Sequence, residues 1–383
     1  MIPYGKQDIS QADIDSVVAV LKSDYLTQGP QVPLFEQSVA SAVQAEFAVA
    51  LNSATSALHV ACLALGLGKG DRLWTSPNTF VASSNCALYC GAKVDFVDID
   101  KHSYNMCVLE LEKKLKLAKE QGSLPKIIIP VHFAGQSCDM KRIYELSQEY
   151  GFKIIEDASH AIGGKYLGRP VGNCQYSDIT VFSFHPVKIV TTAEGGVAVT
   201  NQKKLAQKMQ LFRSHGVTRD VDLMTKELEG PWYYQQVDLG FNYRMTEIQA
   251  ALGLSQITRL DSFVEIRNRL ANIYNEALDD LPLKLPFVDS NIYSSYHLYP
   301  IQILSPSKTR LQVFNALREK GIGVNVHYIP VHTQPYYHNL GFKEGDFKEA
   351  EKYYANAISI PLHQDLKPEE QTYVINVLKE LLE

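Results

Sequence analysis

A single lysine, Lys188, lies between a proline and a polar turn in the stretch SFHPVKIVTTAEGG, residues 183–196. Lysine can form a Schiff base with an aldehyde and can then act as a general acid and base. Asp157 ends the apolar run KIIED, and Ser183 ends the run ITVFS, five residues before Lys188. At the carboxyl end of a parallel strand, such side chains project into the crevice where α/β proteins bind ligands.

Two further groups complete this pattern. The segment Asn52-Ser53-Ala54-Thr55-Ser56 lies where a strand turns into a helix, so its hydroxyls and free N–H groups can hold an anion. Phe80 stands at another strand-to-helix junction. An anion turn, an aromatic ring, a strand-end acid and a lysine are the groups that pyridoxal 5′-phosphate (PLP) requires. Each residue alone is more often structural, and it is their order along one sheet edge that favours this cofactor.

The elements that must position these residues follow an alternating pattern from Phe47 to Thr200. Apolar, β-rich runs alternate with stretches of helical periodicity, which predicts an α/β fold with a large, mostly parallel sheet covered on both faces. The predicted strands are FAVALN, DRLWTS, KVDFVDI, KIIIPVHF, KIIED, ITVFSF and GVAVT.

The chain of 383 residues is too long for one ordinary compact domain. A long helical run over residues 246–278 predicts a connection between two units, and the segments after Tyr296 read as a small α+β domain. We therefore expect a large domain over residues 1–245, and over residues 246–383 a linking helix with a small C-terminal domain.

Composition narrows the possible partners. A formal charge of −5 leaves no basic face for nucleic acid or for an anionic membrane surface. No apolar run approaches the roughly 20 residues that span a bilayer, and the N-terminus lacks the apolar region of a signal peptide. The six cysteines form no CxxC pair. We expect a cytoplasmic protein whose partners are small molecules and other subunits.

Two other motifs are not interpreted as sites. The glycines of Gly66-Leu67-Gly68-Lys69-Gly70 follow a helix and precede a strand, the reverse of a phosphate loop, so they predict a helix C-cap and turn. His327 and His332 are separated by Pro330, which prevents the continuous helix that would place both on one face. We therefore expect no metal site.

Taken together, these motifs resemble those of the DegT-type sugar aminotransferases, PLP-dependent enzymes that act on nucleotide-linked keto sugars. The resemblance covers essentially the whole chain and implies the aspartate aminotransferase-like fold, PLP fold type I. Within the family it points to the UDP-sugar 4-aminotransferases of pseudaminic acid biosynthesis. The segments that carry it are SDYLTQGP, NSATSAL, EDASHAIGG, SFHPVKIVTTAEGG, RSHGVTRD, PWYYQQVDLGFNYRMTEIQAALG and HYIPVH.

Carried over to this chain, the resemblance implies that Lys188 is the Schiff-base lysine and that Asp157 pairs with the pyridinium nitrogen. His160 would contact the phenolic oxygen of the cofactor ring, and Phe80 would stack on that ring. Lys188 would thus be both the covalent anchor and the group that moves the proton.

The same resemblance implies the remaining binding residues. Ala54, Thr55 and Ser183 would bind the cofactor phosphate, and Asn242 would reach it from the second subunit of a homodimer. The residues implied to line the nucleotide-sugar pocket are Tyr4, Asp24, Tyr25, Leu26, Thr27, Tyr243, His327, Tyr328, Ile329 and Pro330.

Two positions depart from the family pattern. Many relatives carry glycine where this chain has Ala54 and Ala193, and the added methyl group restricts positive φ and close approach to phosphate. Since the pseudaminic-type members resemble this chain at both positions, we interpret the alanines as marks of a subgroup.

The implied reaction is transfer of an amino group from L-glutamate to a nucleotide-linked keto sugar. The resemblance implies, as the first hypothesis, C-4 of UDP-2-acetamido-2,6-dideoxy-β-L-arabino-hex-4-ulose as the acceptor and UDP-4-amino-4,6-dideoxy-N-acetyl-β-L-altrosamine as the product. Amination at C-4 or C-3, and the stereochemistry of the product, stay open at this point. Two alternatives also stay open: a PLP-dependent sugar dehydratase, in which relatives typically carry histidine at the lysine position, and a cofactor-binding regulator without turnover.

Overall fold

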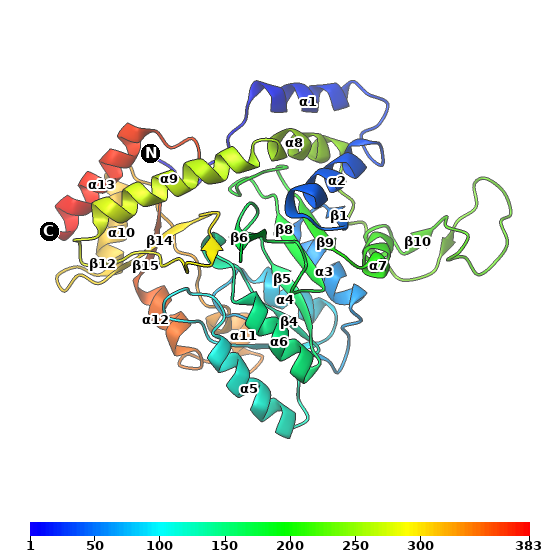
Figure 1. Ribbon diagram of the computed structural model, residues 1–383, viewed down its shortest axis with the longest axis horizontal. Helices are drawn as coiled ribbons and strands as arrows, with labels where there is room; N and C mark the ends of the chain where they lie inside the picture. The colour runs from blue at the N-terminus through cyan, green and yellow to red at the C-terminus, as the bar shows by residue number, and fades with distance from the viewer.

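The computed structural model describes residues 1–383, and a seven-stranded sheet lies at its centre (Figure 1). The strand order is β1-β9-β8-β5-β4-β2-β3; the neighbours from β8 to β3 are parallel, and β9 runs antiparallel to both β8 and β1. These strands lie in the seven predicted runs, so the α/β class with a mostly parallel sheet is confirmed. Their bounds are β1 (Phe47–Leu51), β2 (Arg72–Thr75), β3 (Lys93–Phe96), β4 (Ile127–Ile129), β5 (Lys153–Asp157), β8 (Ile179–Ser183) and β9 (Gly196–Thr200).

Helices cover both faces of this sheet because successive strand side chains point to opposite faces. In β4, Ile127 and Ile129 pack into the core beneath α3, α4 and α7, whereas Ile128 packs beneath α5 and α6. All three isoleucines are fully buried. A third core joins β1, β8 and β9 to α2 and α8. The helices are α2 (Gln31–Val43), α3 (Ala54–Ala64), α4 (Ala82–Tyr89), α5 (Val108–Glu120), α6 (Met140–Tyr150), α7 (Lys203–Arg213) and α8 (Glu247–Ile257).

The predicted helical run over residues 246–278 is wrong as one element, because it is divided into α8 and α9 (Leu260–Leu278). Arg259 lies at the break, and its guanidinium donates to Asp8 at 3.2 Å and to Asp13 at 2.5 Å. Asp13 belongs to α1 (Gln11–Leu21) and is fully buried. These bonds tie the break to the N-terminal segment, a long-range interaction that helical periodicity does not encode.

The C-terminal unit has a core of its own, built on a three-stranded antiparallel sheet with the order β12-β14-β15. The first part of α9 packs with the large sheet and the second part packs with this smaller core. Figure 1 shows α9 running from the large unit to the C-terminal helices. The domain boundary at residue 245 stays a prediction. The further elements here are β12 (Leu283–Lys284), β14 (Tyr299–Ile303), α10 (Arg310–Glu319), α12 (Lys348–Asn356), β15 (Ala357–Ile360) and α13 (Pro368–Leu382).

Smaller elements complete the fold. An arm carrying β10 and β11 projects from the body (Figure 1). Three large apolar side chains close to β11 in the sequence are exposed: Trp232, Tyr234 and Leu239. None of the helices is both long enough and apolar enough to span a membrane. The smaller elements are β6 (Lys165–Tyr166), β7 (Arg169–Pro170) and β13 (Ile292–Tyr293) in one small sheet, β10 (Val217–Thr218) with β11 (Gln235–Gln236), η1 (Phe133–Gly135), η2 (Val331–Thr333) and α11 (Pro335–His338).

Candidate active site

A cavity of about 550 Å³ lies at the carboxyl ends of β5 and β8, between the large sheet and the C-terminal unit. This is the edge at which α/β sheets bind ligands. The residues of the predicted site that line it are Tyr4, Ala54, Thr55, Phe80, Asp157, His160, Ser183, Lys188, His327 and Tyr328. Residues far apart in the sequence therefore meet around Lys188.

The other predicted binding residues do not line the cavity of their own chain. The loop over residues 24–27 lies against α8, where the N–H of Glu247 donates to the Leu26 carbonyl at 3.0 Å. Tyr243 stacks on Phe241 with ring centroids 4.9 Å apart. The residues outside the cavity lining are Asp24, Tyr25, Leu26, Thr27, Asn242, Tyr243, Ile329 and Pro330. Their binding roles stay predictions.

The N-terminus of α3 forms the predicted anion turn. Ser53 caps the helix, and its Oγ accepts from the N–H of Ser56 at 3.1 Å. The N–H groups of Ala54 and Thr55 have no acceptor within the chain. Such unpaired N–H groups at a helix start attract anions. Gly196 supports this turn from behind, because a Cβ there would lie 2.4 Å from the Ala54 nitrogen.

The two alanines that depart from the family pattern fit their positions. Ala54 is the first residue of α3, so its backbone is helical and needs no glycine. Ala193 adopts a φ of 66°, which is unusual for a residue with a side chain. Its N–H donates to the Thr191 hydroxyl at 3.0 Å, which stabilises this turn.

Asp157 is held in one orientation at the floor of the cavity. It is 5% exposed, and its Oδ2 accepts from the Ser83 hydroxyl at 2.6 Å. Its Oδ1 accepts from the N–H of Ser159 at 3.1 Å. Sequence reasoning did not find Ser83, although it lies only three residues after Phe80 at the start of α4.

The amine of Lys188 faces a histidine that sequence reasoning also missed. Lys188 Nζ lies 3.4 Å from His297 Nε2. Burial lowers the pKa of Lys188 to about 8, although the nearby charge of Asp157 opposes this shift. About a tenth of the amine is therefore neutral at pH 7, far more than for an ordinary lysine. His297 precedes β14 in the C-terminal unit, and no motif in the sequence marks it.

His160 presents a neutral ring to the same cavity. Its Nδ1 accepts from the N–H of Ala134 at 3.3 Å, so the ring proton lies on Nε2, which is 3.0 Å from the Tyr328 hydroxyl. Burial, followed by the charge of Lys188, holds the pKa of His160 well below its usual value. His160 can thus donate a hydrogen bond without adding a second cation beside Lys188.

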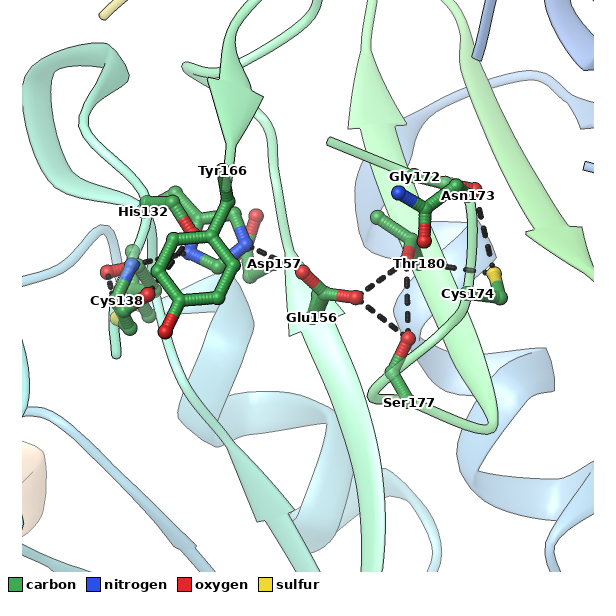
Figure 2. Close-up of polar contacts among 12 residues, drawn as sticks. His132, Cys138, Glu156, Asp157, Tyr166, Gly172, Asn173, Cys174, Ser177 and Thr180 are labelled. Atoms are coloured by element: carbon green, nitrogen blue, oxygen red, sulfur yellow. Dashed lines mark hydrogen bonds and ion pairs between the residues drawn. The ribbon is translucent and has the colours of Figure 1, made fainter. Parts of the chain in front are cut away.

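Figure 2 shows the polar cluster around Glu156, the residue that precedes Asp157 on β5. Glu156 is almost fully buried, and its Oε2 lies 2.7 Å from His132 Nε2. Its Oε1 accepts from the hydroxyls of Ser177 at 2.5 Å and Thr180 at 2.9 Å. Burial raises the pKa of Glu156, but the hydrogen bond and the charge of His132, together with the hydrogen bonds from Ser177 and Thr180, outweigh burial and lower it overall. Because adjacent strand residues face opposite sides, this cluster fixes the strand that carries Asp157.

Replacing Glu156 with alanine should lower the free energy of unfolding by about 3–5 kcal/mol, because the buried His132 Nε2 would lose its partner and the hydroxyls of Ser177 and Thr180 would lose their carboxylate acceptor. Denaturant titration followed by circular dichroism measures this change. Glu120→Ala is the matched control, since Glu120 is exposed at the end of α5. Equal unfolding midpoints for the two variants would contradict a stabilising role of the cluster.

The other two motifs are the glycine-rich segment after α3 and the pair His327 and His332. Gly66 follows the last turn of α3 with a φ of 75°, so the predicted C-cap turn is confirmed. His327 Nδ1 lies 2.8 Å from the Ser359 hydroxyl, and His332 Nε2 lies 2.8 Å from Glu351. No group of three or more histidine, cysteine, aspartate or glutamate side chains is arranged to hold a metal ion.

Comparison with known proteins identifies the family to which a chain with this site belongs. The profile of the DegT/DnrJ/EryC1/StrS aminotransferase family matches residues 7–379. The chain belongs to this family. It is 38% identical over 386 residues to the UDP-4-amino-4,6-dideoxy-N-acetyl-β-L-altrosamine transaminase of Campylobacter jejuni, covering 100% of this chain and 98% of that protein. The family assignment makes the protein a PLP-dependent aminotransferase.

Solved structures agree with this assignment. The fold matches Helicobacter pylori PseC, an aminotransferase involved in the biosynthesis of pseudaminic acid, with a TM-score of 0.90 and 32% identity. It matches a sugar aminotransferase of Streptococcus pneumoniae in its PMP form with a TM-score of 0.90 and 31% identity. Both alignments cover 100% of this chain and 99% of the other. The fold is therefore PLP fold type I.

Proposed function

We propose that this enzyme transfers the amino group of L-glutamate to C-4 of UDP-2-acetamido-2,6-dideoxy-β-L-arabino-hex-4-ulose. The product is UDP-4-amino-4,6-dideoxy-N-acetyl-β-L-altrosamine, an intermediate of pseudaminic acid biosynthesis. The observation that carries this proposal is the 38% identity, over the whole chain, to the transaminase named for that product. The likeness to PseC supports the same pathway.

The residues around the cavity fit PLP. The unpaired N–H groups of Ala54 and Thr55 and the hydroxyl of Ser183 can donate hydrogen bonds to the cofactor phosphate. Gly196 has no side chain, which allows its backbone to lie close to the turn at Ala54. When bound, PLP supplies an electron sink that makes the carbon beside a linked amino group acidic. The remaining cofactor residues are proposed as Asp157 at the pyridine nitrogen, His160 at the phenolic oxygen and Phe80 on the ring face.

Lys188 is the catalytic residue of this proposal. Its amine anchors the cofactor, then takes the proton from the donor carbon and returns it on the other side of the reacting system. A pKa near 8 suits both tasks, because the neutral amine accepts a proton and the ammonium donates one. Lysine at this position also favours amino transfer over the dehydratase alternative.

The sugar nucleotide is proposed to bind in the part of the cavity that Tyr4, His327 and Tyr328 line. We propose a homodimer in which Asn242 of one subunit reaches the cofactor phosphate of the other, and Tyr243 enters with it. This is supported by the position of Asn242 outside the cavity of its own chain. The further residues proposed at the nucleotide sugar are Asp24, Tyr25, Leu26, Thr27, Ile329 and Pro330.

The test supplies the purified, PLP-loaded enzyme with L-glutamate and the UDP-linked 4-keto sugar. We expect equal amounts of 2-oxoglutarate and of an amino sugar whose new C–N bond is at C-4, identified by mass spectrometry and NMR. Amination only of a different keto sugar, or at C-3, would overturn the sugar assignment. Loss of water without nitrogen transfer would favour the dehydratase.

A further inference from the structure

The ring of His297 occupies an unusual position for a buried histidine. It is 5% exposed, its Nε2 lies 3.4 Å from Lys188 Nζ, and its Nδ1 has no hydrogen-bond partner. An unpaired buried polar atom costs about 1–3 kcal/mol. A position that served packing alone would be filled better by an apolar ring, so the imidazole calls for a functional explanation.

The neighbouring histidines cannot take the same role. Both ring nitrogens of His160 are used, by Ala134 and Tyr328. His327 is bonded through Nδ1 to Ser359. Only His297 has a ring nitrogen within hydrogen-bonding distance of the lysine amine. Its ring also packs against His160, with centroids 4.4 Å apart, which limits its movement.

The backbone of His297 is fixed by a buried arginine. Arg267 of α9 is fully buried, and its Nη1 donates to the carbonyls of Tyr296 at 3.1 Å and His297 at 3.2 Å. The same nitrogen donates to the carbonyl of Leu362 at 3.0 Å. The helix that joins the two units therefore holds the imidazole in place beside the lysine.

We propose that His297 is a catalytic hydrogen-bond acceptor that holds the protonated amine of Lys188 between the two proton transfers of the reaction. The proposal rests on the assignment of Lys188 as the reacting amine. Nε2 accepts an N–H of the lysine, and the ring proton lies on Nδ1. His297 itself gains and loses no proton: the proton from the donor carbon stays on Lys188 until Lys188 delivers it.

The charges around the pair agree with this direction of the hydrogen bond. Burial, followed by the positive charge of Lys188 and, more weakly, that of Arg267, holds the pKa of His297 well below its usual value, so its ring stays neutral and can accept. Asp157 is the acid that favours the ammonium form of Lys188. His185 and Glu194 also line the cavity, and they are present unchanged in every variant below.

The direction in which the pKa of Lys188 changes when His297 is replaced tests the proposal. Losing an acceptor destabilises the ammonium, so His297→Phe should lower the pKa of Lys188 by about one pH unit from its value near 8. This pKa is measured on the full-length chain freed of PLP, by competitive labelling with acetic anhydride at a series of pH values and mass spectrometry of the Lys188 peptide. No sugar or glutamate is used, so the outcome is independent of the proposed substrate.

His297→Gln is the matched variant, because its side-chain oxygen can accept at a position close to that of Nε2. It should restore the pKa of Lys188, whereas a purely structural role would leave both variants with the wild-type value. Circular dichroism and the melting temperature establish that each variant is folded. An unchanged or raised pKa in His297→Phe would overturn the proposal. In the loaded enzyme, the acidic limb of the pH–rate profile should move down by the same amount.

Discussion

Lys188→Ala should reduce the rate of amino transfer from L-glutamate by at least about 10³-fold. General acid–base catalysis by one positioned group contributes about 10²–10⁴-fold, and the covalent anchor of the cofactor is lost with the same side chain. Because its pKa is about 8, the Lys188 amine can both accept and donate a proton near neutral pH. No other amine lines the cavity. The measurement is the rate of 2-oxoglutarate formation by enzyme saturated with PLP.

Two comparisons separate loss of the amine from loss of the fold. Lys203→Ala removes an exposed lysine at the start of α7 and should leave the rate unchanged. Adding a small primary amine such as ethylamine should restore part of the activity of Lys188→Ala, because the amine can diffuse into the space of the missing side chain. Wild-type turnover by a folded Lys188→Ala enzyme would refute the assignment of Lys188.

The sheet could be predicted from sequence because its strands are buried on both faces. Runs such as KIIIPVHF and ITVFSF are almost continuously apolar, and helical periodicity separates them, which is the pattern of a covered parallel sheet. Asp157 and Ser183 each end such a run, so their position at one edge follows from strand direction alone. The ten predicted residues around the cavity follow largely from that edge and from the family resemblance.

What could not be predicted depends on contacts between distant segments. His297 reaches Lys188 because a C-terminal segment folds over the edge of the sheet, and nothing near His297 in the sequence indicates this. The break at Arg259 depends in the same way on Asp8 and Asp13. Ser83 is different: it lies in the first turn of α4, only three residues after Phe80, so a search along the chain next to Phe80 would have found a hydroxyl near the strand-end acid.

Asp157→Asn should lower kcat by about 10²–10³-fold, because a neutral amide cannot stabilise a protonated pyridine nitrogen as a carboxylate does. The side chains are nearly the same size, and the amide oxygen can still accept from Ser83, so the fold should be retained. Measurement of kcat at saturating PLP separates this effect from weaker cofactor binding. Asp15→Asn, at an exposed position on α1, is the matched control.

Ser83→Ala adds a graded test of the same carboxylate. The variant removes one of the two hydrogen bonds to Asp157 but leaves its charge, so kcat should fall by no more than about tenfold, the worth of one hydrogen bond. The order of rates should therefore be wild type, then Ser83→Ala, then Asp157→Asn. If Ser83→Ala were as slow as Asp157→Asn, the orientation of the carboxylate rather than its charge would be the larger contribution, and the proposed role of Asp157 at the pyridine nitrogen would have to be revised.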